Sequence, residues 1–412
     1  MKVATIFKDR NLFNVFILGI ASGLPIVLVL STLSVWLKEI GISKTAIGLF
    51  ALTTTPYTLK FLWSPFIDGI RIPLLYEKFG IRKSWLIVTQ IFLFIWISLL
   101  AVSNPENSLK FTAICTLMVA FLSATQDIVI DAYRIEILEK EKQGLGSTVL
   151  VYGYRIGMLI SGALALILAE YMSFVSVYLI MALCFLLFAL FSSILPASKK
   201  ADKQKFSTYS DWIKYHIIAP FKDFLKRDNW LFIILFIILF KLGDAFAGIM
   251  TNPFLLELGF TKADIALYVK TFGLFATLFG TLIGGIICAK YSMKVSLLFA
   301  GTIQMLTNLI FCLQAIIGNS KIMLSFTIGA ENLAGGIGTV AFVAYISNLC
   351  NVKYTATQYA LLSSLSAIAR TWFSSSSGWF SDQMNWVEFF LFSTVLAIPG
   401  IIMILFMKDK IK

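Results

Sequence analysis

The chain has 412 residues, of which 58% are apolar and 14% are charged, and its mean hydropathy is +0.86. Soluble proteins contain roughly 45–50% apolar and about 25% charged residues. This composition excludes a cytosolic enzyme, a disulfide-rich secreted module and a disordered chain. At about 20 residues per membrane crossing, the long apolar runs leave room for twelve helices. The sequence therefore predicts an all-α polytopic membrane protein with twelve transmembrane helices.

The apolar runs fall into two groups of six. In chain order they cover residues 13–35, 46–66, 84–102, 111–132, 147–169 and 174–195, and then 230–250, 265–288, 295–317, 322–346, 358–379 and 387–407. We expect an N-terminal six-helix half at 1–195, a cytoplasmic linker with an interfacial helix at 196–229, and a C-terminal half at 230–412. This pseudo-symmetric 6+6 plan resembles the major facilitator superfamily, with an unrelated twelve-span fold as the alternative.

The net charge of +12 is distributed unevenly between alternate loops. Basic residues gather in the loops on the same side as the N-terminus, for example Arg71 and Lys78 after the second run and Lys199 and Lys200 in the linker. Such loops face the cytoplasm, so we expect both termini there and the lipid bilayer, not nucleic acid, as the surrounding partner. The first run is too long for the apolar core of a signal peptide, and we interpret it as an uncleaved helix.

The chain offers little from which to build a metal or cofactor site. Its five cysteines lie far apart, without ligand spacing, and its single histidine, His216, falls in the linker, where we expect a surface position. Zinc and haem sites draw on clustered cysteine and histidine side chains. We therefore expect no metal and no cofactor, and because no nucleophile and base can be paired, no enzyme.

Ionisable residues occur deep within the apolar runs. Such a side chain costs at least about 2.5–3.5 kcal/mol at the bilayer centre and usually faces a bundle interior or water. By position within each run, the deep residues are Lys60, Asp127, Arg155, Lys241, Asp244, Glu331 and Arg370, with Lys270 shallower. A receptor or scaffold has no need of this set, whereas a polar pathway does.

Four of these residues occupy counterpart helices of the two halves. Arg155 and Arg370 lie on the fifth and eleventh runs, and Asp127 and Glu331 lie on the fourth and tenth. A central pathway would thus present basic and acidic groups from both halves. This set suits an anionic, hydroxyl-rich substrate and leaves at least one acid available for a proton.

Structural alternatives stay open for the acidic positions and for two tyrosines. Lys241 and Asp244 are three residues apart and can form a self-neutralising pair. Asp127 and Glu331 have no partner within one helical turn, which favours a proton carrier, against pairing with a basic residue on a neighbouring helix. The tyrosines within about a turn of these charges, among them Tyr57 and Tyr154, are candidates for stacking on sugar rings, or they are core residues.

A second set of charges lies near the inner membrane surface. Asp131 and Arg134 share a helical stripe with Asp127, and we interpret them as gating residues. Asp68 ends the second run, and Arg82 and Lys83 open the third. This loop resembles the facilitator loop that latches the inner gate, so a mechanical role is expected for these three residues.

Eight strings carry a closer resemblance. In chain order they are ASGLP (21–25), KFLWSP (60–65), ATQDIVIDAYR (124–134), GYRIGMLISG (153–162), KLGDAFA (241–247), KTFGL (270–274), ENLAGGIGTVAFVA (331–344) and TATQYALLS (355–363). Together they resemble the AmpG-type muropeptide permeases of the major facilitator superfamily. The similarity runs from about residue 13 to 407. Some members of the family carry a further helical pair, on which we expect the core mechanism not to depend.

The resemblance implies an importer of the Gram-negative inner membrane. Its substrate would be N-acetylglucosaminyl-1,6-anhydro-N-acetylmuramic acid and its peptides, moved from periplasm to cytoplasm by proton symport for peptidoglycan recycling. A neighbouring family that carries acetyl-CoA, another bulky anion, remains the alternative. We expect a monomer that works by alternating access.

The expected roles follow from the charges and from the resemblance together. Substrate contacts are expected at Tyr57, Lys60, Tyr154, Arg155, Lys241, Lys270 and Arg370. The coupling proton is expected on Asp127, Asp244 or Glu331, and gating at Asp68, Arg82, Lys83, Asp131 and Arg134.

Overall fold

A computed structural model describes residues 9–42, 44–198, 208–227, 229–261 and 264–407. Within these ranges the chain is helical and contains no strand, which confirms the all-α prediction. The helices cluster into two compact units. Unit 1 comprises Met1–Glu139, Val149–Phe224 and Cys350–Ser364, and unit 2 comprises Lys140–Thr148, Leu225–Leu349 and Leu365–Lys412.

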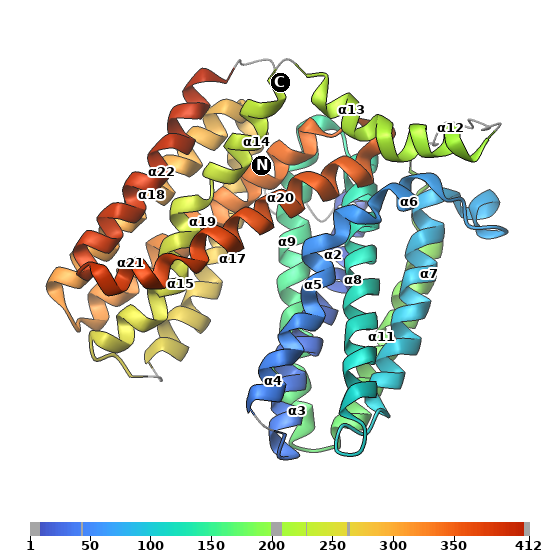
Figure 1. Cartoon of the computed structure of the whole chain (residues 1–412), viewed down its shortest axis with the longest axis horizontal. Coiled ribbons are helices and arrows are strands. Elements are labelled where there is room, and N and C mark those ends of the chain that lie inside the picture. The colour runs from blue at the N-terminus through green and yellow to red at the C-terminus, as the bar shows by residue number, and fades with distance from the viewer. Residues whose placement is uncertain (1–8, 43, 199–207, 228, 262–263, 408–412) are drawn as a thin grey trace. The chain divides into compact units, whose positions relative to one another are not determined.

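Unit 1 is built on five long helices. They are α2 (Arg10–Val27), α7 (Leu75–Ala101), α8 (Leu109–Ile137), α9 (Gln143–Leu159) and α11 (Phe174–Ile194). Short segments connect them: η1 (Leu28–Thr32), α3 (Leu33–Glu39), α4 (Lys44–Leu49), η2 (Phe50–Thr54), α5 (Thr55–Leu59), η3 (Lys60–Leu62), α6 (Ser64–Gly69), η5 (Ile160–Leu164) and α10 (Ala165–Ala169). The short η4 (Lys140–Lys142) and the start of α9, up to Thr148, belong to unit 2. Figure 1 shows α2, α7, α8 and α11 side by side.

The predicted linker contains a helical segment that belongs to unit 1. Its parts are α12 (Tyr209–Ile213), η6 (Lys214–Ile218) and α13 (Ala219–Leu225). This segment lies across the end of the bundle, next to α6 (Figure 1). The start of α20 (Thr355–Ser375), with the short η8 (Val352–Tyr354) before it, also packs in unit 1.

Unit 2 consists of a second set of helices. They are α14 (Trp230–Leu239), α15 (Leu242–Glu257), η7 (Ile265–Phe272), α17 (Gly273–Lys290), α18 (Met293–Ile317), α19 (Lys321–Leu349), α21 (Ser377–Gln383) and α22 (Trp386–Phe406), together with the later part of α20. Helix α19 packs against both α17 and α18, and α18 packs against α22.

Ten helices of the described residues are long and apolar enough to cross a membrane. They coincide with ten of the twelve predicted runs. The run at 46–66 is instead divided into short helices, because Pro56 and Pro65 each start a new helical turn without a backbone N–H to continue the previous one. The run at 358–379 falls on α20 and α21, where serine, threonine and glutamine lower the hydropathy.

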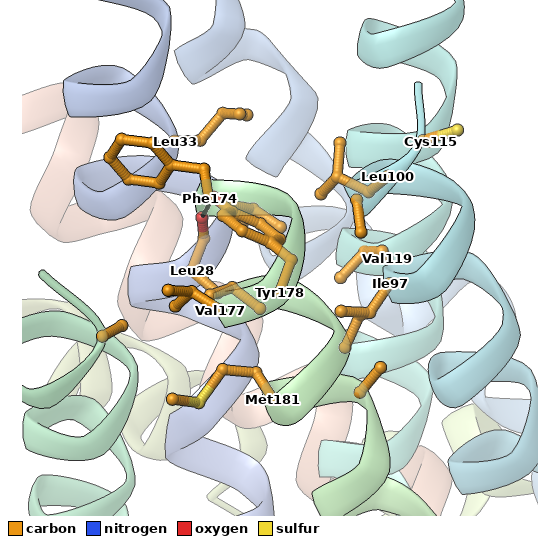
Figure 2. Close-up of a cluster of buried hydrophobic side chains, with 14 of the residues drawn as sticks. Leu28, Leu33, Ile97, Leu100, Cys115, Val119, Phe174, Val177, Tyr178 and Met181 are labelled. Atoms are coloured by element: carbon orange, nitrogen blue, oxygen red, sulfur yellow. Dashed lines mark hydrogen bonds between the residues drawn. The ribbon is translucent and has the colours of Figure 1, made fainter. Parts of the chain in front are cut away.

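The core of unit 1 is an apolar cluster around the widened helical turn η1. Figure 2 shows Leu28 and Leu33 beside Phe174, Val177 and Tyr178 of α11. The hydroxyl of Tyr178 donates a buried 2.8 Å hydrogen bond to the carbonyl of Leu28. Within a membrane such a carbonyl must find an internal partner, so the cluster both fills space and satisfies the irregular backbone of the first helix.

Candidate transport site and gate

A proline in the first helix explains how the acidic stripe of α8 is anchored. Pro25 has no N–H, so it leaves the carbonyl of Ala21 without its usual partner four residues later. The side-chain amide of Gln126 donates to that carbonyl at 3.0 Å. The next residue on α8, Asp127, accepts a 2.5 Å hydrogen bond from the hydroxyl of Ser22. Two contacts therefore fix Asp127 against α2.

The broken second run brings further predicted residues to Asp127. Lys60 lies on η3, between the two proline breaks, and its charge attracts both Asp127 and Asp131. Tyr57, one turn earlier, interacts with Asp127 and with Tyr154 of α9. Four predicted site residues from three parts of unit 1 thus form one polar cluster, which we call the unit 1 cluster (Tyr57, Lys60, Asp127 and Tyr154).

Arg155 follows Tyr154 on α9 and is half-buried. Its Nη1 lies 4.0 Å from the sulfur of Met158, and its Nε is buried without a hydrogen-bond partner among the described residues. A guanidinium nitrogen that is buried without a hydrogen-bond partner is costly unless an acceptor such as an anion reaches it. Arg155 is therefore suited to hold an anionic group.

A second polar cluster lies in unit 2. Lys241, which precedes α15, donates to Asp244 Oδ2 at 3.3 Å, and Gln304 of α18 donates to the same oxygen at 2.9 Å. The negative charge of Asp244 also acts on Glu331 of α19. Glu331 Oε2 accepts a 3.0 Å hydrogen bond from the amide of Asn332. We call these residues the unit 2 cluster (Lys241, Asp244, Gln304, Glu331 and Asn332).

Two predicted site residues have side chains outside the described part of the structure. Lys270 belongs to η7 and Arg370 belongs to α20. Their predicted substrate contacts remain predictions.

The predicted gate residue Asp68 binds the first turn of α20. Its Oδ2 accepts from the backbone N–H of Thr357 at 2.8 Å and from the Thr357 hydroxyl at 2.7 Å, and its Oδ1 faces the N–H of Ala356 at 3.4 Å. A carboxylate here satisfies backbone donors that a helix N-terminus leaves without partners, and it interacts favourably with the helix dipole. Asp68 thus caps a helix 288 residues away in sequence.

Arg82 links Asp68 to a second buried carboxylate. Its guanidinium lies 2.7 Å from Asp68 and 2.6 Å from Glu136, and all three side chains are almost fully buried. Gly80 lies two residues earlier with a φ of 75°, in a region that favours glycine, and the turn there directs the chain into the straight part of α7. Lys83 donates to the carbonyl of Leu195 at 2.7 Å, so it ties α7 to the end of α11 instead of joining the carboxylates.

The other predicted gate pair, Asp131 and Arg134, begins one turn after Asp127 on α8. Asp131 and Arg134 are 3.6 Å apart, and the fully buried guanidinium of Arg134 lies 5.6 Å from the ring of Tyr359 on α20. A cation over an aromatic ring is attracted to its face. Arg134 therefore contacts the same segment of α20 that Asp68 caps.

His216 is buried, so the predicted surface position is wrong. Its ring lies against Gly69 and packs with Trp212 and Tyr215, and the residue is 9% exposed. Burial lowers the pKa of His216, and the nearby negative charge of Asp68 opposes this shift. The indole of Trp212 also donates to the carbonyl of Gly69 at 3.4 Å, which fixes the linker helix on α6.

Several residues of the two clusters and of the gate could not be identified by searching the apolar runs for charged residues. Gln304 and Ser22 are uncharged, and Glu136 lies off the stripe that joins Asp131 to Arg134. The string TATQYALLS contains Thr357, and its resemblance to the permeases is the only signal for that residue. Among the described residues no group of three or more histidine, cysteine or acidic side chains is arranged to hold a metal ion.

The family model of the Major Facilitator Superfamily matches residues 15–374. The chain therefore belongs to this superfamily of membrane transporters.

Relatives that are similar over nearly the whole chain indicate to which group within the superfamily it belongs. The chain is 42% identical to a putative transporter, AmpG 4, of Rickettsia felis, with 100% of both chains covered. It is 38% identical to the anhydromuropeptide permease of Escherichia coli K12 over 99% of this chain and 82% of that protein. These matches place it among the AmpG-type transporters.

Solved transporters share the fold at much lower identity. The transporter FucP in its outward conformation matches with a TM-score of 0.70 at 13% identity, over 97% of this chain and 98% of FucP. The proton:xylose symporter XylE matches with a TM-score of 0.69 at 12% identity, over 97% of this chain and 95% of XylE. These likenesses concern the fold alone.

Proposed function

We propose that this chain is a proton-coupled importer of anhydro-muropeptides. Its substrate is N-acetylglucosaminyl-1,6-anhydro-N-acetylmuramic acid with or without its peptide. It moves this substrate from periplasm to cytoplasm by alternating access, as a step in peptidoglycan recycling. The similarity to an anhydromuropeptide permease over 99% of this chain supports the substrate class.

The observation that carries a transport mechanism is the pair of half-buried charged clusters, one in each unit. Basic and acidic side chains on membrane helices are costly unless they line a polar pathway. Each cluster contains a lysine, a carboxylate and hydrogen-bonding side chains from several helices. Such clusters support a transporter of a polar, charged solute.

The proposed topology has twelve spans in two halves, 1–195 and 230–412, joined by a cytoplasmic linker at 196–229. The divided segment 46–66 and the polar segment 358–379 supply the two further spans. Non-helical backbone and polar side chains are tolerated at membrane depth where they line a wet pathway. Both termini lie in the cytoplasm, the protein is monomeric, and the membrane is the bacterial inner membrane.

In the proposed mechanism basic residues hold the carboxylates and sugar oxygens of the substrate. Lys60 and Arg155 do so in unit 1, and Tyr57 and Tyr154 supply ring faces for the sugars. Lys241 contributes from unit 2, and Lys270 and Arg370 complete the proposed set. The buried Nε of Arg155 supports an anion site there.

The proposed gate is the contact of Asp68 with the first turn of α20. Arg82 orients Asp68, Lys83 fixes the start of α7, and Asp131 with Arg134 holds the same α20 segment through Tyr359. Release of this segment would open the cytoplasmic end of the pathway.

Uptake into membrane vesicles tests the coupling. Accumulation of radiolabelled anhydro-muropeptide should require an inward proton gradient and should stop when an uncoupler collapses it. Glu331→Gln should abolish gradient-driven uptake and preserve substrate binding. Accumulation that persists without the gradient contradicts proton symport.

Ligand-dependent thermal stability tests the substrate class. Anhydro-muropeptide should raise the unfolding temperature of the purified protein, and Arg155→Met should weaken this effect. Stabilisation by acetyl-CoA alone would reverse the substrate assignment and leave the transport mechanism in place.

A further inference from the structure

We infer that Gln304 is a positioning residue of the proton-coupling site, which holds Asp244 as a carboxylate so that Glu331 is the acid that takes up and releases the proton. This inference rests on the proposed proton symport. It adds a residue that carries no charge and that acts through its neighbour.

The first observation is that two donors converge on one oxygen. Asp244 Oδ2 accepts from Gln304 Nε2 at 2.9 Å and from Lys241 Nζ at 3.3 Å. Donors favour the ionised form of a carboxyl group, because a proton on that oxygen would have to displace one of them. Asp244 is therefore set up to remain a carboxylate.

The orientation of the Gln304 amide follows from the same geometry. If the amide were reversed, its oxygen would face the carboxylate of Asp244, and two acceptors would repel each other. With Nε2 on Asp244, Oε1 is buried without a hydrogen-bond partner among the described residues. That oxygen lies against Gly338 of α19, where a Cβ would clash with it. A glycine at 338 is thus what leaves room for the amide.

Glu331 lies two helical turns before Gly338 on the same helix and has weaker support for a negative charge. Its Oε2 accepts a hydrogen bond from the neutral amide of Asn332 at 3.0 Å, and the charge of Asp244 repels a carboxylate at Glu331. Asn332 is itself shared, since its amide also donates to Ile328 and its oxygen accepts from Thr277. A second negative charge next to Asp244 is disfavoured, so the proton resides on Glu331.

The charged groups near this pair are few. Lys241 and Asp244 come from the start of α15 and Glu331 comes from α19. Among the described side chains, the charged residues of the other helices packed there lie at helix ends, at Lys290, Lys294, Asp382 and Glu388. The side chain of Lys270 on η7 is outside the described part of the structure. The charge balance of the described cluster is therefore two acids against one lysine.

The test is the pH profile of gradient-driven anhydro-muropeptide uptake in vesicles. Gln304→Leu removes both the donor and the acceptor at nearly constant side-chain volume. Gln304→Met is a second variant, in case the protein with the branched leucine side chain does not fold. Loss of a hydrogen bond to a charged group should move the midpoint of the profile to higher pH by about one unit, because the acid pair then binds its first proton more readily. The uptake rate at the optimal pH should be affected less than the position of this midpoint.

Two comparisons separate positioning from general damage. In an Asp244→Asn background, adding Gln304→Leu should cause no further shift, because the proposed effect passes through Asp244. Gln314→Leu removes another buried glutamine of the same helix, which is bonded to the Gly318 carbonyl and to Thr327 and not to Asp244, and should leave the midpoint unchanged.

An unchanged midpoint in both Gln304 variants, or an equal shift in the Gln314 control, overturns the inference while gradient-driven uptake by the wild type stands. Wild-type uptake that does not depend on the proton gradient refutes the proposed symport, and it thereby also refutes the inference about Gln304. The two failures are therefore distinguishable in one data set.

Discussion

Replacing Asp68 by asparagine tests the proposed gate at its most localised contact. The carboxylate accepts two hydrogen bonds from Thr357 and faces the N–H of Ala356, all at the start of α20. Asparagine keeps one acceptor oxygen, replaces the other by an NH₂ group that faces donors, and removes the negative charge. Arg82 retains Glu136 as a partner, so the change should weaken the gate without unfolding unit 1.

The magnitude follows from the hydrogen bonds and the charge that the substitution removes. Hydrogen bonds to a charged group contribute about 1.5–3 kcal/mol each, and the charge at a helix N-terminus contributes about 0.3–1 kcal/mol. Because asparagine preserves part of this, we expect the closed gate to be destabilised by about 2–4 kcal/mol. At about 1.4 kcal/mol per factor of ten, the open population should rise roughly 30- to 1,000-fold.

Alkylation of Cys350 reports the opening. This half-buried cysteine begins the segment of unit 1 that leads into α20, and the other four cysteines can be replaced by alanine. The Asp68→Asn variant should react faster by the predicted ratio. Thr357→Val, which loses one hydroxyl donor to the charged carboxylate worth about 1.5–3 kcal/mol, should react roughly 10- to 150-fold faster than the wild type and more slowly than Asp68→Asn. Thr357→Ser should match the wild type.

Equal alkylation rates in Asp68→Asn and wild type would refute the proposed gate, because Asp68 would then not stabilise its closed form. A Thr357→Val rate equal to that of Asp68→Asn would also count against it, since the charge would then contribute nothing beyond the hydroxyl contact.

Three further substitutions test stability in detergent. Arg82→Met should destabilise the fold by about 3–5 kcal/mol, because it leaves two buried carboxylates without their shared cation; neutralising both carboxylates in the same variant should restore much of the unfolding temperature. Gly336→Ala places a Cβ against a backbone carbonyl of α17 and should cost about 1–3 kcal/mol, whereas Gly335→Ala meets nothing within 4 Å and should be close to neutral. Outside the membrane, the ion pair with Lys321 lowers the pKa of Asp264 to about 2. This contact therefore stabilises the fold above about pH 4 and is lost as the pH falls toward 2. Asp264→Asn should lower the unfolding temperature at pH 6, and the unfolding temperatures of variant and wild type should converge at pH 2.

The apolar runs predict most helices because length and hydropathy alone identify a membrane helix. The divided segment at 46–66 is visible as Pro56 and Pro65, yet the apolar run conceals how completely they interrupt the helix. The contact between Gln126 and the carbonyl of Ala21 could not be predicted, because helical periodicity relates residues of one helix and is silent about partners 105 residues apart.

The same limit explains which site residues could be predicted. Charge inside an apolar run identifies Asp127, Asp244 and Glu331, because each is expensive in lipid wherever it points. Gln304 cannot be identified in this way, since an amide costs less and carries no charge. Glu136 is missed for another reason: it ends a helix among other charges, where a solvated position is the ordinary expectation.

The charges of the unit 1 cluster and the adjacent Arg155 leave a surplus that suits an anion. Lys60 and Arg155 are the basic groups, and Asp127 is the carboxylate, which already accepts a hydroxyl from Ser22. Among these described side chains the balance is two positive charges to one negative, with a guanidinium nitrogen that has no hydrogen-bond partner. An anionic substrate would neutralise this surplus.

The unit 2 cluster has the opposite balance, with Asp244 and Glu331 against Lys241. In the proposed symport the proton neutralises this surplus, because a carboxyl group binds it without any further ligand. Substrate and proton would therefore correct opposite imbalances in the two clusters, and a half-loaded transporter would keep one imbalance buried. A buried uncompensated charge is costly, so movement with both or with neither is favoured over movement with one. This division of charge between the two clusters supports the proposed proton symport of an anion, and it does so without requiring that substrate and proton contact each other.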